Sequence, residues 1–138
     1  MATAGATPPE PLVLDASALL EALIGTELGI DVRRRMRGRQ LHAPAHLDAE
    51  VLSAVGRLHR AGQLPGTAAA TALDELARAP IQRHPLAGLL SGAWDRRERQ
   101  RLVDALYLEL TASLDAARLL TTDARLARSD ESAELIAR

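Results

Sequence analysis

Apolar and polar residues follow one another along the chain in short blocks, which predict strands separated by helices. The run Leu12, Val13 and Leu14 is short, branched and apolar, which is typical of a buried strand. Residues 46–62 instead repeat apolar side chains at helical spacing until Gly62 ends the pattern. The same criteria predict strands at 11–14, 41–44, 81–84, 117–123 and 133–138. They predict helices at 17–24, 26–37, 46–62, 64–79, around 89–94, at 99–114 and at 123–129.

Strands that alternate with helices of this length predict an α/β fold with a parallel sheet covered on both faces. Thr67 is expected to cap the helix over 64–79, and Trp94 is expected to pack in the core. Residues 1–10, MATAGATPPE, are interpreted as a flexible N-terminal leader. Neither a repeat nor a linker divides the rest, so residues 11–138 are expected to form a single domain.

Composition narrows the class of protein. Apolar residues make up 47% of the 138 positions and charged residues 25%, which indicates a folded globular chain. Cysteine is absent, which excludes disulfides, thiolate metal sites and cysteine nucleophiles. No apolar run reaches the roughly 18 residues of a membrane span, and the first basic residue is Arg33, unlike a secretory signal. A cytoplasmic protein without a membrane anchor is therefore expected.

Positive charge is carried entirely by arginine, in a chain whose net charge is only −1. Two clusters stand out, at residues 33–39 and 96–101. Each is interpreted either as a solvated helix face or as a contact for phosphate, whose oxygens match the forked guanidinium. Aromatic residues are limited to Trp94 and Tyr107, so stacking on bases is excluded as the main mode of nucleic-acid binding.

Two acids lie at the carboxyl ends of predicted strands. Asp15 comes after the strand at 11–14, and Asp123 ends the strand segment at 117–123. Ligands of parallel sheets bind beyond the carboxyl ends of the strands, so these acids meet if their strands are neighbours. The alternative is that each acid caps the helix that follows it, and for either residue alone capping is the simpler interpretation.

Two further acids lie on helix faces that border the core. At roughly 100° per residue, Glu50 lies about 40° from Ala54, and Asp104 lies about 40° from Leu108. Glu109 is about 140° from Asp104 and is expected to point away from it. Four converging carboxylates repel one another unless arginine or a divalent cation neutralises them. Oxygen ligands without cysteine favour Mg²⁺ or Mn²⁺, and the histidines show no ligand spacing.

Four segments carry these acids in a fixed order: LVLDASALLEAL (12–23), HAPAHLDAEVLSAV (42–55), LVDALYLEL (102–110) and RLLTTDARLA (118–127). Their order and spacing resemble the four acidic motifs of PIN-domain ribonucleases, especially the VapC-type toxins of bacterial toxin–antitoxin modules. The resemblance covers residues 12–128 and implies a three-layer α/β/α sandwich around a central parallel sheet. It also implies an endoribonuclease that hydrolyses RNA phosphodiester bonds with water activated by Mg²⁺ or Mn²⁺.

The resemblance assigns roles residue by residue. It implies that the catalytic and metal-binding acids are Asp15, Glu50, Asp104 and Asp123. It implies supporting roles for Ser17, Thr121 and Arg97. The implied partners are an RNA substrate, a VapB-like antitoxin and a second copy of the chain in a homodimer.

Two alternatives to the ribonuclease remain. In the first alternative, the protein has the PIN fold but uses it to bind antitoxin or RNA without significant cleavage. The presence of all four acids argues against this alternative. A receiver-like or phosphatase-like domain also places an acid after its first strand, but a receiver needs a late lysine, and this chain has none.

Overall fold

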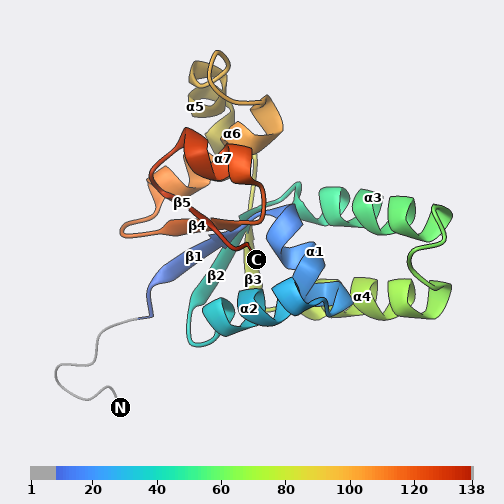
Figure 1. Ribbon diagram of the computed structural model, residues 1–138. Coiled ribbons are helices and arrows are strands. Elements are labelled where there is room, and N and C mark those ends of the chain that lie inside the picture. Colours follow the sequence, from blue (N-terminus) through green and yellow to red (C-terminus); the bar gives the residue numbers. More distant parts are fainter. Residues whose placement is uncertain (1–8, 138) are drawn as a thin grey trace, which may run out of the picture.

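Five parallel strands form the sheet that the sequence predicts, in the spatial order β3-β2-β1-β4-β5 (Figure 1). The structure is a computed structural model that describes residues 9–137. The strands are β1 (Pro11–Leu14), β2 (Gln40–Pro44), β3 (Ile81–His84), β4 (Arg118–Thr121) and β5 (Ala133–Leu135). The helices are α1 (Ala16–Ile24), α2 (Glu27–Met36), α3 (Leu47–Arg60), α4 (Gly66–Arg78), α5 (Leu90–Asp95), α6 (Leu102–Ser113) and α7 (Ala124–Ser129), with a 3₁₀ turn, η1 (Ala87–Leu89), before α5.

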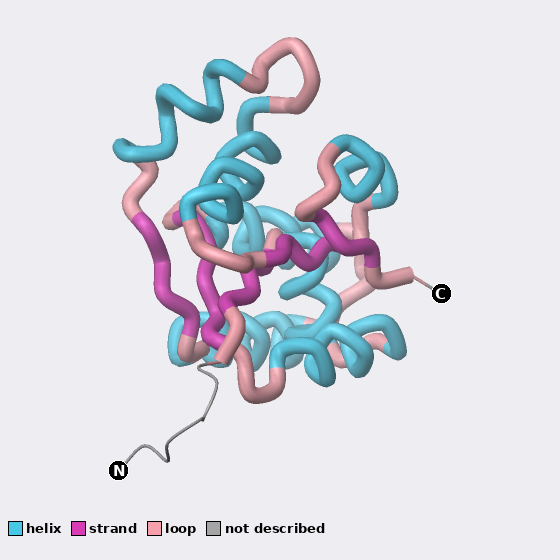
Figure 2. The backbone as a smooth tube through the Cα atoms, turned by 90° about the vertical axis from the view of Figure 1, so that its left-hand side faces the viewer, coloured by secondary structure: helices cyan, strands magenta, loops and turns pink. Residues whose placement is uncertain are grey.

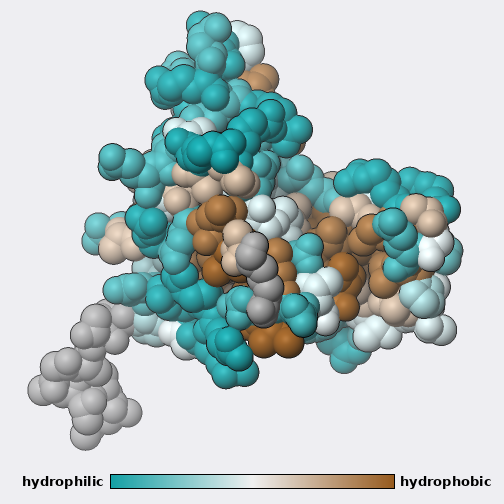
Figure 3. Space-filling model, viewed as in Figure 1, coloured by the Kyte–Doolittle hydropathy of each residue, from teal (hydrophilic) through white to brown (hydrophobic). Residues whose placement is uncertain are grey.

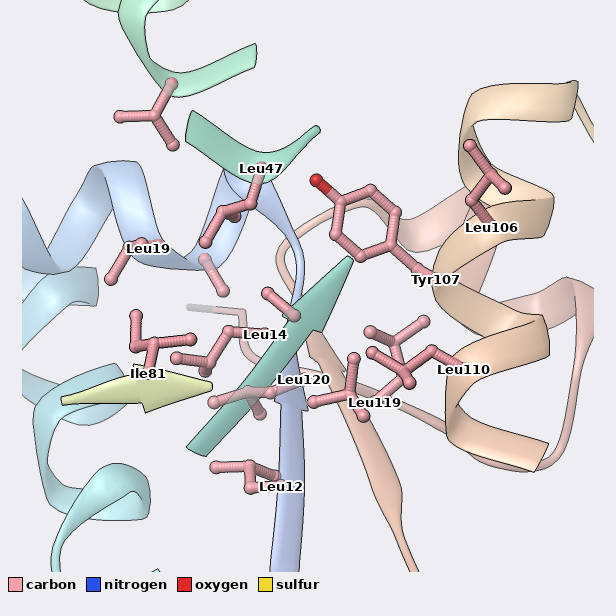
Figure 4. Close-up of a cluster of buried hydrophobic side chains, with 14 of the residues drawn as sticks. Leu12, Leu14, Leu19, Leu47, Ile81, Leu106, Tyr107, Leu110, Leu119 and Leu120 are labelled. Atoms are coloured by element: carbon pink, nitrogen blue, oxygen red, sulfur yellow. The ribbon is translucent and has the colours of Figure 1, made fainter. Parts of the chain in front are cut away.

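Helices lie on both sides of the strands, which confirms the predicted three-layer α/β class (Figure 2). In Figure 4, Leu19 of α1 lies on one side of the strands, and Leu110 of α6 lies on the other. The β1 residues Leu12 and Leu14 are completely buried between these layers. A strand covered on both faces requires apolar residues without alternation, which explains the continuous run in the sequence.

The central position of β1 determines where the site lies. Leu14 at its end pairs with Leu120 of β4, and the Asp15 N–H donates to the Leu120 carbonyl at 3.2 Å. The strands that precede Asp15 and Asp123 are therefore neighbours, as the prediction of a shared sheet edge required. Both acids lie beyond the carboxyl ends of adjacent strands.

Helices α1 and α2 pack unusually close to each other. A Cβ built on Gly29 of α2 would lie 2.0 Å from the Glu21 carbonyl oxygen of α1. Gly25, with φ of 75°, ends α1 in the left-handed conformation that glycine adopts at little cost. Glycine is thus required at position 25 for its backbone freedom and at position 29 because it has no side chain.

Two local predictions are wrong. Trp94 is 56% exposed instead of packed in the core, because the short helix α5 lies at the edge of the molecule. Thr67 does not cap α4, because the helix already starts at Gly66 and Pro65 takes the cap position.

The leader prediction falls mainly on residues 1–8, which lie outside the described residues. Glu10 already contacts the fold, since its carbonyl accepts from the Gln40 N–H at 3.3 Å. In the described part of the chain, every helix is too short or too polar to cross a bilayer.

Candidate active site

One pocket of about 270 Å³ contains all four acids that the sequence singles out. Asp15 follows β1, Glu50 lies in the first turn of α3, Asp104 lies in the first turn of α6, and Asp123 precedes α7. This carboxylate pocket is also lined by Ser17, Arg57, Arg101 and Tyr107, with Ala16, Leu20 and Ala54. Acids from four separate segments therefore share one wall at the carboxyl end of the sheet.

Asp15 is the deepest of the four acids, with only 5% of its surface exposed. Its Oδ1 accepts hydrogen bonds from the Ser17 hydroxyl at 2.7 Å and from the Ala18 N–H at 2.9 Å. Its Oδ2 accepts from the Thr121 hydroxyl. Burial raises the pKa of Asp15 to about 6, and the charge of Asp104 adds to the rise, while these three hydrogen bonds oppose it. Burial therefore makes ionisation of Asp15 cost free energy, which a nearby positive charge would offset.

The two hydroxyl groups of the motifs connect β1 to β4. Ser17 donates to Asp15 and accepts from the Thr122 N–H at 3.1 Å. Thr121 accepts in turn from the Asp123 N–H at 3.0 Å. The supporting positions predicted for Ser17 and Thr121 thus correspond to a bonded chain that fixes both acids at the strand ends.

Helix capping by Asp15 and Asp123, the alternative interpretation, is also observed. The Asp15 carboxylate caps α1, and the Asp123 Oδ1 accepts from the N–H groups of Arg125 and Leu126 at the start of α7. Capping occupies one Asp123 oxygen and leaves its Oδ2 without a hydrogen-bond partner in the described chain. The two interpretations are therefore compatible with each other.

Glu50 is contacted by two side chains that were not predicted as site residues. The Tyr107 hydroxyl donates to its Oε1 at 2.6 Å, and the His46 Nε2 lies 3.3 Å from the same oxygen. In Figure 4 the Tyr107 hydroxyl points from α6 towards the start of α3. Burial and the Glu50 carboxylate raise the pKa of Tyr107 well above its usual range, so the phenol stays a donor.

Asp104 is paired with Arg101, one turn earlier, whose Nε lies 3.1 Å from its Oδ2. The carboxylate of Asp104, followed by those of Asp123 and Glu50, raises the pKa of the Arg101 guanidinium. Arg97, the arginine that the resemblance selected, instead contacts the Trp94 carbonyl and lies 3.6 Å from Glu98. The spacing of three residues between Arg101 and Asp104 was the signal that could have identified Arg101.

The donor set fits a hard divalent cation. Glu50, Asp104 and Asp123 each use one carboxylate oxygen within the protein, and their other oxygens have no hydrogen-bond partner among residues 9–137. Oxygen donors of this kind are those that Mg²⁺ and Mn²⁺ prefer. Among residues 9–137, no three acidic or histidine side chains are placed so that they could hold a metal ion as they stand. An ion would have to draw the free oxygens together.

Comparisons with known proteins agree with the geometry. The PIN domain family model matches residues 12–132. The chain is 50% identical over 131 residues to Ribonuclease VapC3 of Mycobacterium tuberculosis, covering 94% of this chain and 95% of that protein. It is 34% identical over 118 residues to Ribonuclease VapC12 of the same organism, covering 86% and 91%.

A solved structure shares the fold. The crystal structure of PAE2754 from Pyrobaculum aerophilum superposes with a TM-score of 0.64 and 26% sequence identity, covering 94% of this chain and 85% of that one. The matched family model spans all four acids of the carboxylate pocket. The chain therefore belongs to the PIN domain family, and within it to the VapC group.

Proposed function

We propose that this chain is a Mg²⁺- or Mn²⁺-dependent endoribonuclease that acts as the toxin of a toxin–antitoxin pair. The observation that carries the proposal is the convergence of Asp15, Glu50, Asp104 and Asp123 on one pocket. The relatives named ribonuclease VapC3 and VapC12, which match along nearly the whole chain, support RNA as the substrate. Acids arranged around a cation at a sheet edge suit phosphodiester hydrolysis.

The four acids would hold the ion. When bound, Mg²⁺ or Mn²⁺ activates water for attack on the phosphodiester and stabilises the leaving oxygen. The Tyr107 hydroxyl fixes the Glu50 carboxylate, and the Ser17 and Thr121 hydroxyls fix Asp15. These contacts limit the reorganisation that the acids undergo during the reaction.

Positive charge at the pocket comes from Arg57 and Arg101. Arg101 neutralises Asp104 in this structure, and its guanidinium has further N–H donors for phosphate oxygens. Positive charge beside acids lowers the repulsion that a phosphodiester meets when it approaches them. Arg101 therefore contributes to substrate binding at the edge of the acids.

A VapB-like antitoxin, self-association as a homodimer and a cytoplasmic location belong to the same proposal. The antitoxin is supported by the similarity to VapC proteins. Self-association follows from the resemblance alone, the cytoplasmic location follows from the composition of the sequence, and both stay predictions.

The proposal is tested by incubating the protein with a mixture of cellular RNA and mapping the ends of the products. The wild type is expected to cut RNA internally when Mn²⁺ or Mg²⁺ is present, and excess chelator is expected to stop the reaction. Asp15→Asn is expected to lose cleavage and growth inhibition, because the amide lacks the negative charge that binds the ion. Thermal melting establishes that the variant is folded.

Full cleavage by Asp15→Asn, or in excess chelator, would overturn the proposal. Asp115→Asn provides the matched control, because Asp115 is exposed in the turn before β4, at the opposite end of the sheet. RNA that is bound but left intact by the wild type with metal would favour the alternative, a PIN-fold protein that binds without cleaving.

A further inference from the structure

A second pocket, of about 380 Å³, adjoins the carboxylate pocket and shares Arg101 and Asp104 with it. Arginines dominate its wall, and we call it the arginine pocket. It is lined by Arg97, Arg99, Gln100, Arg101 and Arg125, with Glu98, Asp104, Leu126 and Ser129. The lining of the arginine pocket thus contains four arginines and only two acids, and this pocket lies directly beside the carboxylate pocket.

Most arginines elsewhere in the described chain are already paired. Arg33, Arg35 and Arg83 form ion pairs that join separate elements. Arg96, next to the arginine pocket, is consumed in the same way by Glu109 and Asp130. Ion pairs that hold helices and strands together therefore occupy these four of the 17 basic residues.

Two of the four arginines in the arginine pocket are not paired in this way in the described chain. Arg99 and Arg125 are exposed, and neither side chain has an ion pair or hydrogen bond within residues 9–137. They come from the α5–α6 connection and from α7, so two segments distant in sequence present free guanidinium groups to one cavity. Unpaired arginines gathered from separate segments are available to an external anion.

Two neighbouring features complete the pocket. The Arg97 guanidinium lies 4.7 Å from the centre of the exposed Trp94 ring, which limits its motion at the rim. Gln100 is nine-tenths buried, and its Oε1 has no hydrogen-bond partner in the described part of the chain. Figure 3 shows mainly hydrophilic side chains over the upper part of the face, where Figure 1 places α5 and α7.

We infer that the arginine pocket binds the sugar–phosphate backbone of the RNA substrate, next to the phosphodiester that is cut. The inference rests on the proposed function and adds the residues that hold the substrate. Guanidinium groups bind phosphate oxygens in a forked geometry, and such contacts set the position of a nucleic acid without reading its bases. Arg99 and Arg125 are the main contacts, and Arg101 links the two pockets.

The position of the pocket favours RNA over an acidic peptide. A nucleic acid that places one phosphodiester among the four acids necessarily continues into adjoining surface with further phosphates. The arginine pocket shares a wall with the acids, so it lies on that path. The scarcity of aromatic side chains agrees with recognition of the backbone by charge.

The test measures RNA binding without cleavage. Binding of a fluorescent single-stranded RNA is followed by anisotropy in excess chelator, with the double variant Arg99→Gln/Arg125→Gln. Affinity is expected to fall at least tenfold. For two lost phosphate contacts, the slope of log affinity against log salt is expected to shrink by about 1.4. Melting temperature and its response to Mn²⁺ are expected to stay at the wild-type values.

Arg37→Gln/Arg60→Gln is the matched control, since it removes equal charge from exposed positions after α2 and at the end of α3. Equal affinity for RNA in the two double variants would overturn the inference. So would loss of binding to a polyglutamate peptide with RNA binding unchanged, because the pocket would then be a protein-docking site. RNA binding that depends on Arg99 and Arg125 in a chain that never cleaves would refute the proposed function alone.

Discussion

Asp15 combines two roles in one carboxylate. It caps α1 through the Ala18 N–H, and it is the deepest acid of the carboxylate pocket. Three donors surround it, yet burial still raises its pKa to about 6. The carboxylate is thus costly to ionise without a cation, which is the state expected of a metal ligand before the ion binds.

This cost predicts a pH effect on the metal-free protein. The pKa of Asp15 rises from 3.8 to about 6 on folding, so the stabilising contribution of its proton is complete below pH 3.8 and is lost as the pH rises through 6. Relative to Asp15→Asn, the wild type is expected to lose as much as about 3 kcal/mol of unfolding free energy across this range. Urea unfolding of both proteins in chelator, between pH 4 and pH 7.5, measures the difference. A difference that does not change with pH would contradict the explanation.

Tyr107 is predicted to act through Glu50. Tyr107→Phe keeps the buried ring but removes the donor to the Glu50 Oε1. Loss of this contact, worth about 1 kcal/mol, is expected to lower the cleavage rate at saturating RNA roughly threefold to tenfold and to weaken Mn²⁺ binding. Ser113→Ala, on the same helix, is the control. If Tyr107→Phe retains both the wild-type rate and the wild-type Mn²⁺ affinity, Tyr107 serves packing alone.

Helices α1 and α2 depend on a close backbone contact. Gly29→Ala places a methyl group on the Glu21 carbonyl and is expected to lower the free energy of unfolding by roughly 2–3 kcal/mol. Gly66→Ala in the first turn of α4 meets only His59, at 3.6 Å, and is expected to stabilise the protein by about 0.5 kcal/mol. Chemical denaturation compares the two variants. Similar free energies would show that α2 can shift away from α1.

The sequence was sufficient to predict the elements that carry the acids. An apolar run followed by an acid recurs at Asp15 and Asp123, and helical periodicity placed Glu50 and Asp104 at the edge of the core. The contact between Tyr107 and Glu50 joins positions 57 apart and depends on how α6 lies against α3, which periodicity does not specify. Trp94 was mispredicted because an aromatic residue in a short helix carries no information about which neighbours cover it.

At the scale of the molecule, β1 in the middle of the sheet brings the site together. Its neighbour β4 positions Asp123 beside Asp15, and α3 and α6 bring Glu50 and Asp104 to the same edge. The arginine pocket lies alongside and provides the opposite charge for a polyanionic substrate. The acidic pocket that we propose for the ion and the basic pocket that we propose for the nucleic acid therefore lie next to each other.

The decisive measurement is calorimetric titration of Mn²⁺ into the wild type, Asp104→Asn and Asp115→Asn. If acids from separate segments act as one ion-binding set, the wild type and Asp115→Asn bind Mn²⁺ saturably. Asp104→Asn then binds at least about tenfold more weakly, a difference of about 1.4 kcal/mol. Equal Mn²⁺ affinity in all three proteins, or no saturable binding by the wild type, would contradict a metal-dependent site at this edge of the sheet.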